Sequence, residues 1–146
     1  MKHQERLTAL RRYLKASNKR YSVEREHLLD VIADMEGQFS IVDIFRKARK
    51  KRFIHAASTL YRNIHAFIDG GFINEIKLCG GRTVYESNLE GDNNFLLCVG
   101  CGKLIKVKNA SLANAQKKIG KEHDFEPLNY IYQIKGYCAD CRNKMD

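Results

Sequence analysis

The hydrophobic pattern of the first 71 residues is helical. Apolar side chains recur at intervals of three and four positions in four stretches, which predicts four helices. The first is "ERLTALRRYLK", and in the second Leu28, Ile32 and Met35 are spaced four and then three apart. The third falls in "GQFSIVDIFRKARK", where Ser40 and Asp43 match the S-x-x-D pattern of a helix-capping box. The fourth is "AASTLYRNIHAFIDGG", which two glycines end.

Alternating patterns follow the fourth helix. "FINEIKL" and "RTVYES" predict two strands around a glycine-containing turn, and the polar stretch "SNLEGDNN" predicts a domain junction. Beyond it, "FLLCV" and "KLIKV" predict two strands, "ASLANAQKKIGK" a helix, and "LNYIYQIKGYC" a long strand. The apolar side of that last helix comprises Leu112, Ala115 and Ile119.

The order of these elements predicts an α+β fold. Two helices joined by a short turn and followed by a hairpin have the plan of a winged helix-turn-helix. We therefore expect a winged-helix domain at residues 1–87, a hinge at 88–94 and a small α/β domain at 95–146.

Four of the five cysteines form two C-x2-C pairs, each at the end of a predicted strand. They are Cys98, Cys101, Cys138 and Cys141. Four thiolates suit tetrahedral Zn²⁺ and leave no coordination position for water or substrate, so we expect one structural zinc ion per chain. An iron–sulfur cluster and disulfides are the alternatives. Cys79, in the hairpin turn, is interpreted as an ordinary small residue rather than a reactive thiol.

The net charge is +9, and residues 1–89 carry +7 of it. A basic N-terminal half favours a polyanion as partner, although a solvated basic face would have the same charge. No apolar run approaches the ~20 residues needed to cross a bilayer, and the N-terminus is too charged for a signal peptide. We therefore expect a soluble, cytoplasmic protein without a membrane partner.

The fourth helix has two distinct sides. Its apolar side comprises Ala57, Leu60, Ile64, Phe67 and Ile68. Its outward side comprises Ser58, Thr59, Tyr61, Arg62 and His65. These outward side chains suit phosphate contacts and base edges in the DNA major groove. A solvated face on a core helix is the equally weighted alternative.

Four motifs occur in the order "STLYRNIHAFIDGGFINEI", "GGRTVYES", "LLCVGCGKLIKV" and "IYQIKGYCADC". In this order they resemble the Fur (ferric uptake regulator) family of bacterial metal-responsive repressors. The first is similar to the family's recognition-helix block, and the second to its wing strand. "LLCVGCGKLIKV" and "IYQIKGYCADC" are similar to its two zinc knuckles, the turns that carry the C-x2-C pairs. The resemblance covers about residues 20–141.

The resemblance implies a homodimer of two-domain subunits, in which the winged helix binds palindromic operators in duplex DNA and the C-terminal domain dimerises. Tyr61 and Arg62 match the family's DNA-reading Tyr-Arg pair. Arg20 matches the basic residue that reaches the adjacent minor groove, and Arg25 matches the arginine that opens the second helix. Glu24 stands where the family usually has proline.

The chain departs from the family at the sensory metal site. The family senses Fe²⁺, Mn²⁺ or Zn²⁺ through histidines and carboxylates near the domain junction. The positions expected to supply such ligands hold Gln38, Asp92, Asn93, Asn94, Phe95, Lys106, Ala113 and Tyr130. Glu86 alone matches an expected ligand, and His123, beside Glu122 and Asp124, is a further candidate that is more often an ordinary surface residue. We expect the sensory site to be lost or rebuilt.

The predicted function is a transcription regulator, most simply a repressor, and not an enzyme. A zinc deaminase would need an H-x-E paired with a P-C-x-x-C motif, but neither C-x-x-C pair here follows a proline, and no nucleophile–base motif stands out. Two alternatives remain: a zinc-ribbon module that binds protein or RNA, and a redox-responsive regulator that acts by zinc release.

Overall fold

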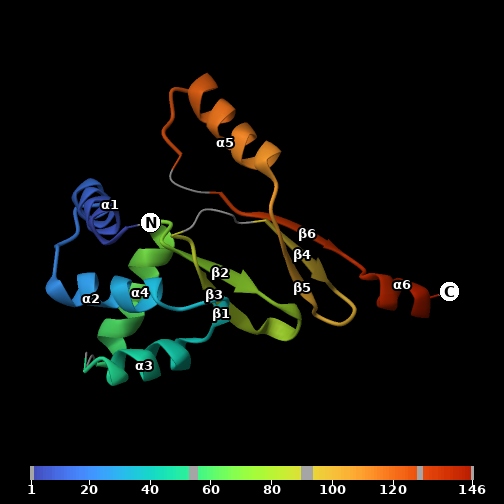
Figure 1. Ribbon diagram of the computed structural model, residues 1–146, viewed down its shortest axis with the longest axis horizontal. Helices are drawn as coiled ribbons and strands as arrows, with labels where there is room; N and C mark the ends of the chain where they lie inside the picture. Colours follow the sequence, from blue (N-terminus) through green and yellow to red (C-terminus); the bar gives the residue numbers. More distant parts are fainter. Residues whose placement is uncertain (1, 53–55, 90–93, 128–129, 146) are drawn as a thin grey trace. The chain divides into compact units, whose positions relative to one another are not determined.

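The computed structural model of the chain describes residues 2–52, 56–89, 94–127 and 130–145 (Figure 1). It divides into two compact units. The first comprises residues up to 76 together with 83–90, and the second comprises residues 77–82 together with the chain from 91 onward. The predicted hinge at 88–94 falls partly on residues 90–93, which lie outside the described residues.

The first unit contains the four predicted helices. They are α1 (His3–Ala16), α2 (Val23–Ala33), α3 (Ile41–Lys50) and α4 (Ala57–Asp69). All four contribute to one hydrophobic core, whose fully buried side chains include Leu10, Leu28, Ile44, Leu60 and Phe67. The predicted apolar side of α4 is confirmed except at Ala57, which is exposed because it lies in the first turn of the helix.

Serine side chains fix where α2 and α3 begin. The Ser22 hydroxyl accepts a hydrogen bond from the Arg25 N–H (3.2 Å). At α3, the Ser40 hydroxyl accepts from the Asp43 N–H, and the Asp43 carboxylate accepts from the Ser40 N–H, which confirms the predicted capping box. That backbone N–H lowers the pKa of Asp43. A serine cap of this kind contributes about 1 kcal/mol to stability.

A three-stranded sheet completes the first unit. Its strand order is β1 (Gln38–Phe39), β3 (Thr83–Ser87), β2 (Ile73–Lys77). β1 runs antiparallel to β3 and places Gln38 opposite Glu86. β1 was not predicted, because two residues are too few to show alternation. The turn between β2 and β3 is a 3-10 turn at Cys79–Gly81, in which the φ angles of Gly80 (81°) and Gly81 (82°) require glycine.

The second unit is a smaller sheet with two helices. Its strand order is β5 (Leu104–Val107), β4 (Asn94–Cys98), β6 (Tyr132–Gly136). β5 is antiparallel to β4, and β6 is parallel to β4, so α5 (Ala110–Glu122) supplies the connection between β5 and β6. The three predicted strands are confirmed, although β6 is shorter than the alternating stretch that predicted it. The short helix α6 (Ala139–Lys144) was not predicted; it follows its N-cap residue Cys138 and contains Cys141, so it overlaps the second cysteine pair.

The predicted apolar side of α5 is only partly buried in the single chain. Leu112 is half-buried, whereas Ala115 and Ile119 are exposed. Among the described residues, no helix is both long enough and apolar enough to cross a membrane.

Candidate metal centre and nucleic-acid interface

The four paired cysteines meet in the second unit. The sulfur atoms of Cys98, Cys101, Cys138 and Cys141 all lie within 4.8 Å of one another. The Cys101 and Cys138 sulfurs are 3.8 Å apart. Four Zn–S bonds of ~2.3 Å at tetrahedral angles place neighbouring sulfurs about 3.8 Å apart. The cysteine cluster therefore fits one zinc ion closed in by four sulfurs.

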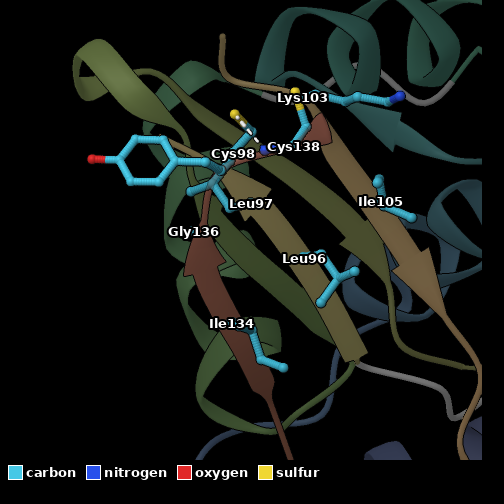
Figure 2. Close-up of a pocket in the computed structure, with 9 residues that line it drawn as sticks. Leu96, Leu97, Cys98, Lys103, Ile105, Ile134, Gly136 and Cys138 are labelled. Atoms are coloured by element: carbon cyan, nitrogen blue, oxygen red, sulfur yellow. Dashed lines mark hydrogen bonds between the residues drawn. The ribbon is translucent and has the colours of Figure 1, made fainter. Parts of the chain in front are cut away.

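Backbone N–H groups stabilise negative charge on the sulfurs. The Cys138 N–H donates to the Cys98 sulfur (3.3 Å), as Figure 2 shows, and the Cys141 N–H donates to the Cys138 sulfur (3.5 Å). The first of these bonds contributes most to lowering the pKa of Cys98 to about 6. The neighbouring Cys98 sulfur in turn raises the pKa of Cys141 to about 12. The cluster therefore stabilises one cysteine as a thiolate. Four neighbouring thiolates would repel one another, so a bound cation is needed to hold all four in the deprotonated form.

Glycines shape the first zinc knuckle. A Cβ at Gly100 would lie 2.9 Å from the Cys141 sulfur, so any side chain there would push the two knuckles apart. Gly102 has a φ of 78°, which returns the chain from the knuckle into β5. These requirements explain the glycines of "CVGCGK" as part of the metal centre.

Cys79 lies outside the cysteine cluster. Its thiol is exposed and donates to the carbonyl oxygens of Cys98 (3.7 Å) and Val99 (3.9 Å). It therefore contacts the backbone of the first knuckle without joining the four sulfurs.

The described residues contain a single cluster of metal-binding side chains, the four cysteines. Glu86 is buried, and its partner across the β1–β3 ladder is Gln38. Phe95 is buried, and its partner in β5 is Lys106. His123 is exposed at the end of α5. Two further expected positions, Asp92 and Asn93, lie outside the described residues.

An open cleft lies between the start of α2 and the first half of α4. It measures about 520 Å³ and is lined by Arg20, Tyr21, Ser22, Glu24, Arg25, Ala56, Thr59, Arg62 and Asn63. Four of the residues predicted to bind DNA therefore share one hollow: Arg20, Arg25, Thr59 and Arg62. The other three, Ser58, Tyr61 and His65, are exposed on α4.

Arg25 is engaged within the cleft. Its Nε donates to the Asn63 side-chain oxygen (3.0 Å), and its Nη1 donates to the Arg20 carbonyl oxygen (2.5 Å). Asn63 is only 4% exposed, so this bond satisfies a buried amide oxygen. Arg25 therefore ties the segment before α2 to α4. The sequence pattern did not single out Asn63; its one signal is a polar residue next to the apolar Ile64, and both are buried.

Comparison with known proteins identifies the family. Residues 16–134 match the family model described as "Ferric uptake regulator family". The chain belongs to the ferric uptake regulator family. The ferric uptake regulation protein of Yersinia pestis is 31% identical over 87 residues, which span 58% of this chain and 59% of that relative. The ferric uptake regulation protein of Escherichia coli K12 is 26% identical over 132 residues, which span 88% of this chain and 89% of the relative.

Solved structures of ferric uptake regulators have the same fold. Fur of Helicobacter pylori aligns with a TM-score of 0.63 at 20% identity, covering 97% of this chain and 95% of that one. The ferric uptake regulator of Pseudomonas aeruginosa with manganese aligns with a TM-score of 0.63 at 21% identity, covering 86% and 95%. A zinc uptake regulator complexed with zinc and DNA aligns with a TM-score of 0.56 at 17% identity, covering 99% and 98%. These likenesses confirm the predicted α+β fold.

Proposed function

We propose that this Fur-family chain is a homodimeric, sequence-specific repressor that binds palindromic operators in duplex DNA in the bacterial cytoplasm. The observation that carries the proposal is the cleft between α2 and α4, where Arg20, Thr59 and Arg62 converge. The likeness to a zinc uptake regulator complexed with zinc and DNA supports it.

Residues on and beside α4 have distinct tasks in this proposal. With α4 in the major groove, the Arg62 guanidinium bonds a guanine edge, and the Tyr61 ring packs against a thymine methyl group. Ser58, Thr59 and His65 contact the backbone or neighbouring base edges. Arg20 reaches the adjacent minor groove, and Arg25 positions the cleft through Asn63.

One face of the second sheet supplies the proposed dimer contact. Leu96 of β4 lies between Ile105 of β5 and Ile134 of β6, and all three side chains are on one face (Figure 2). Ile105 is 38% exposed and Ile134 is 49% exposed, beside a hollow of about 170 Å³. Burial of apolar surface is worth about 25 cal/mol per Å², so a second copy on this face would stabilise both. Two copies then present two α4 helices to half-sites about 34 Å, or one helical turn, apart.

Zinc has a structural role in the proposed regulator. Cys98, Cys101, Cys138 and Cys141 would hold one ion, which supplies a cross-link between the two knuckles and no open coordination position. The thiolates connect the end of β4 to the start of α6, so zinc affinity contributes to the folding free energy of the second unit.

The sensory metal site is proposed to be lost. Phe95 and Ala113 offer no ligand atom, and Lys106 would repel a cation, so operator affinity should stay nearly constant when Fe²⁺, Mn²⁺ or Zn²⁺ is added beyond the first zinc. Titration of zinc-loaded protein with each metal, followed by fluorescence anisotropy on labelled duplex, measures this. A large rise in operator affinity with the second equivalent of metal would refute the proposed loss of the sensory site.

Selection from a pool of random duplexes tests the proposed function. Zinc-loaded protein should enrich a palindrome, and log K for that duplex should fall with log salt by ~0.9 per neutralised phosphate. Filter binding with single-stranded RNA serves as the comparison. Absence of an enriched palindrome together with tighter binding of RNA would favour an RNA-binding zinc ribbon instead.

A further inference from the structure

A basic segment spans the second half of α1 and the connector to α2. Residues 6–22 contain six lysines and arginines and no aspartate or glutamate. They are Arg6, Arg11, Arg12, Lys15, Lys19 and Arg20. Arg20 is the one residue of this segment that matches a DNA contact of the family. The recognition helix therefore does not explain the positive charge of the other five residues.

The segment is held firmly on the first unit. α1 buries Leu7, Leu10 and Leu14 in the core. Tyr13 packs edge-on against Phe72, with ring centroids 6.0 Å apart. A Cβ at Gly70 would lie 2.8 Å from the Tyr13 ring, so α1 fits closely against the end of α4. The cations of α1 therefore have a fixed position relative to the cleft.

Arg11 connects α1 to the cleft. Its guanidinium lies 5.0 Å from the centroid of the Tyr21 ring, and Tyr21 lines the cleft together with Arg20 and Arg62. A guanidinium packed over a ring keeps its N–H donors along the edge available for a phosphate. Tyr21 thus holds an exposed cation beside the proposed DNA surface.

The other charges near Arg11 do not neutralise it. Arg6 and His3, toward the start of α1, pair with Asp30 of α2 at 3.2 and 3.0 Å. Lys15 is exposed one helical turn beyond Arg11, on the same side of α1. Lys19 donates to the Tyr13 hydroxyl (3.4 Å) and lies 5.7 Å from its ring. Asp30 therefore pairs with residues near the start of α1, whereas Lys15 lies near the end of that helix.

We propose that Arg11 and Lys15 bind the phosphate backbone of the operator outside the base pairs that α4 reads. The partner is duplex DNA flanking the palindrome, recognised by charge and not by sequence. The inference rests on the proposed function, because it places a second contact beside the cleft. Each phosphate neutralised adds ~0.9 to the salt slope, which corresponds to about eightfold in affinity near 0.1 M salt.

The test compares variants on short and extended duplexes. The double variant Arg11→Gln, Lys15→Gln should bind a duplex extended by about ten base pairs on one side, where one subunit of the dimer meets flanking DNA, roughly 60-fold more weakly than wild type near 0.1 M salt. Its salt slope should be shallower by ~1.8, and its sequence preference should be unchanged. On a duplex cut at the ends of the palindrome, the two proteins should differ much less. Tyr21→Leu, which removes the ring beneath Arg11, should weaken binding to the extended duplex selectively.

The matched control is Lys117→Gln, Lys118→Gln, which removes two exposed lysines from α5. It should bind both duplexes as wild type does. An α1 double variant with wild-type affinity and slope on the extended duplex would overturn the inference, and so would an equal loss in the control. If wild type shows no sequence preference but the α1 variant still has the shallower slope, the phosphate contact stands and the sequence-specific function fails.

Discussion

Replacement of Cys101 with serine is expected to abolish stoichiometric zinc binding and to unfold the second unit. The Cys101 sulfur is 3.8 Å from that of Cys138, so it bridges the two knuckles directly. A serine hydroxyl stays protonated near neutral pH and is a poor zinc ligand. Structural zinc contributes apparent binding free energies of about 10–16 kcal/mol in zinc-finger peptides, comparable with the total stability of a small domain.

The small size of the second unit makes this loss severe. Its strands are only four or five residues long, and β6 and much of α5 are exposed in the single chain. Below about 70–80 residues a single hydrophobic core supplies little stability, and natural small domains commonly add a structural metal or oligomerise. We therefore expect substoichiometric zinc by metal analysis, loss of strand signal by far-ultraviolet circular dichroism, and loss of the proposed dimer by sedimentation.

The fifth cysteine provides the control. Cys79→Ser removes a thiol that contacts the carbonyl oxygens of Cys98 and Val99 but lies outside the four-sulfur cluster. This variant should retain one zinc per chain and a wild-type melting profile. If Cys101→Ser kept a full zinc equivalent and a folded second unit, the structural role assigned to the metal would be wrong.

Local patterns were sufficient to predict most of the helices and strands. The spacing of Leu28 and Ile32 predicted α2, and the Ser40–Asp43 pair predicted the start of α3, because both signals act within a turn or two of chain. The cysteine cluster was predictable for a similar reason, since each C-x2-C turn brings two sulfurs together and each pair ends a strand.

Features that depend on distant segments were not predictable. β1 exists only through its pairing with β3, in which Phe39 lies opposite Tyr85, 46 positions later in the sequence. The Arg25–Asn63 bond joins residues 38 positions apart, so the sequence suggested Arg25 as a DNA contact but did not reveal its partner. The exposed face of β6 likewise has no local signal, because alternation predicts a strand without showing what covers it.

Arg62→Ala is expected to weaken operator binding by about 1–3 kcal/mol, or roughly 5- to 150-fold, without changing the stability of the chain. Arg62 is exposed on α4 and lines the cleft, and its replacement would remove the proposed bidentate contact to a base edge while leaving the buried side of the helix intact. Anisotropy titrations on the operator and on a scrambled duplex measure the change, and thermal unfolding checks the fold.

The comparison with two other arginines makes this result specific. Arg20→Ala should weaken binding to operator and scrambled duplex more evenly than Arg62→Ala does, because a contact outside the major groove discriminates bases less. Arg142→Ala, on the exposed surface of α6 in the second unit, removes the same charge from a residue that does not line the cleft and should bind as wild type. Wild-type affinity in Arg62→Ala would exclude Arg62 from the interface. Because α4 can read bases only if its outward side enters the groove, that result would also contradict the orientation proposed for α4.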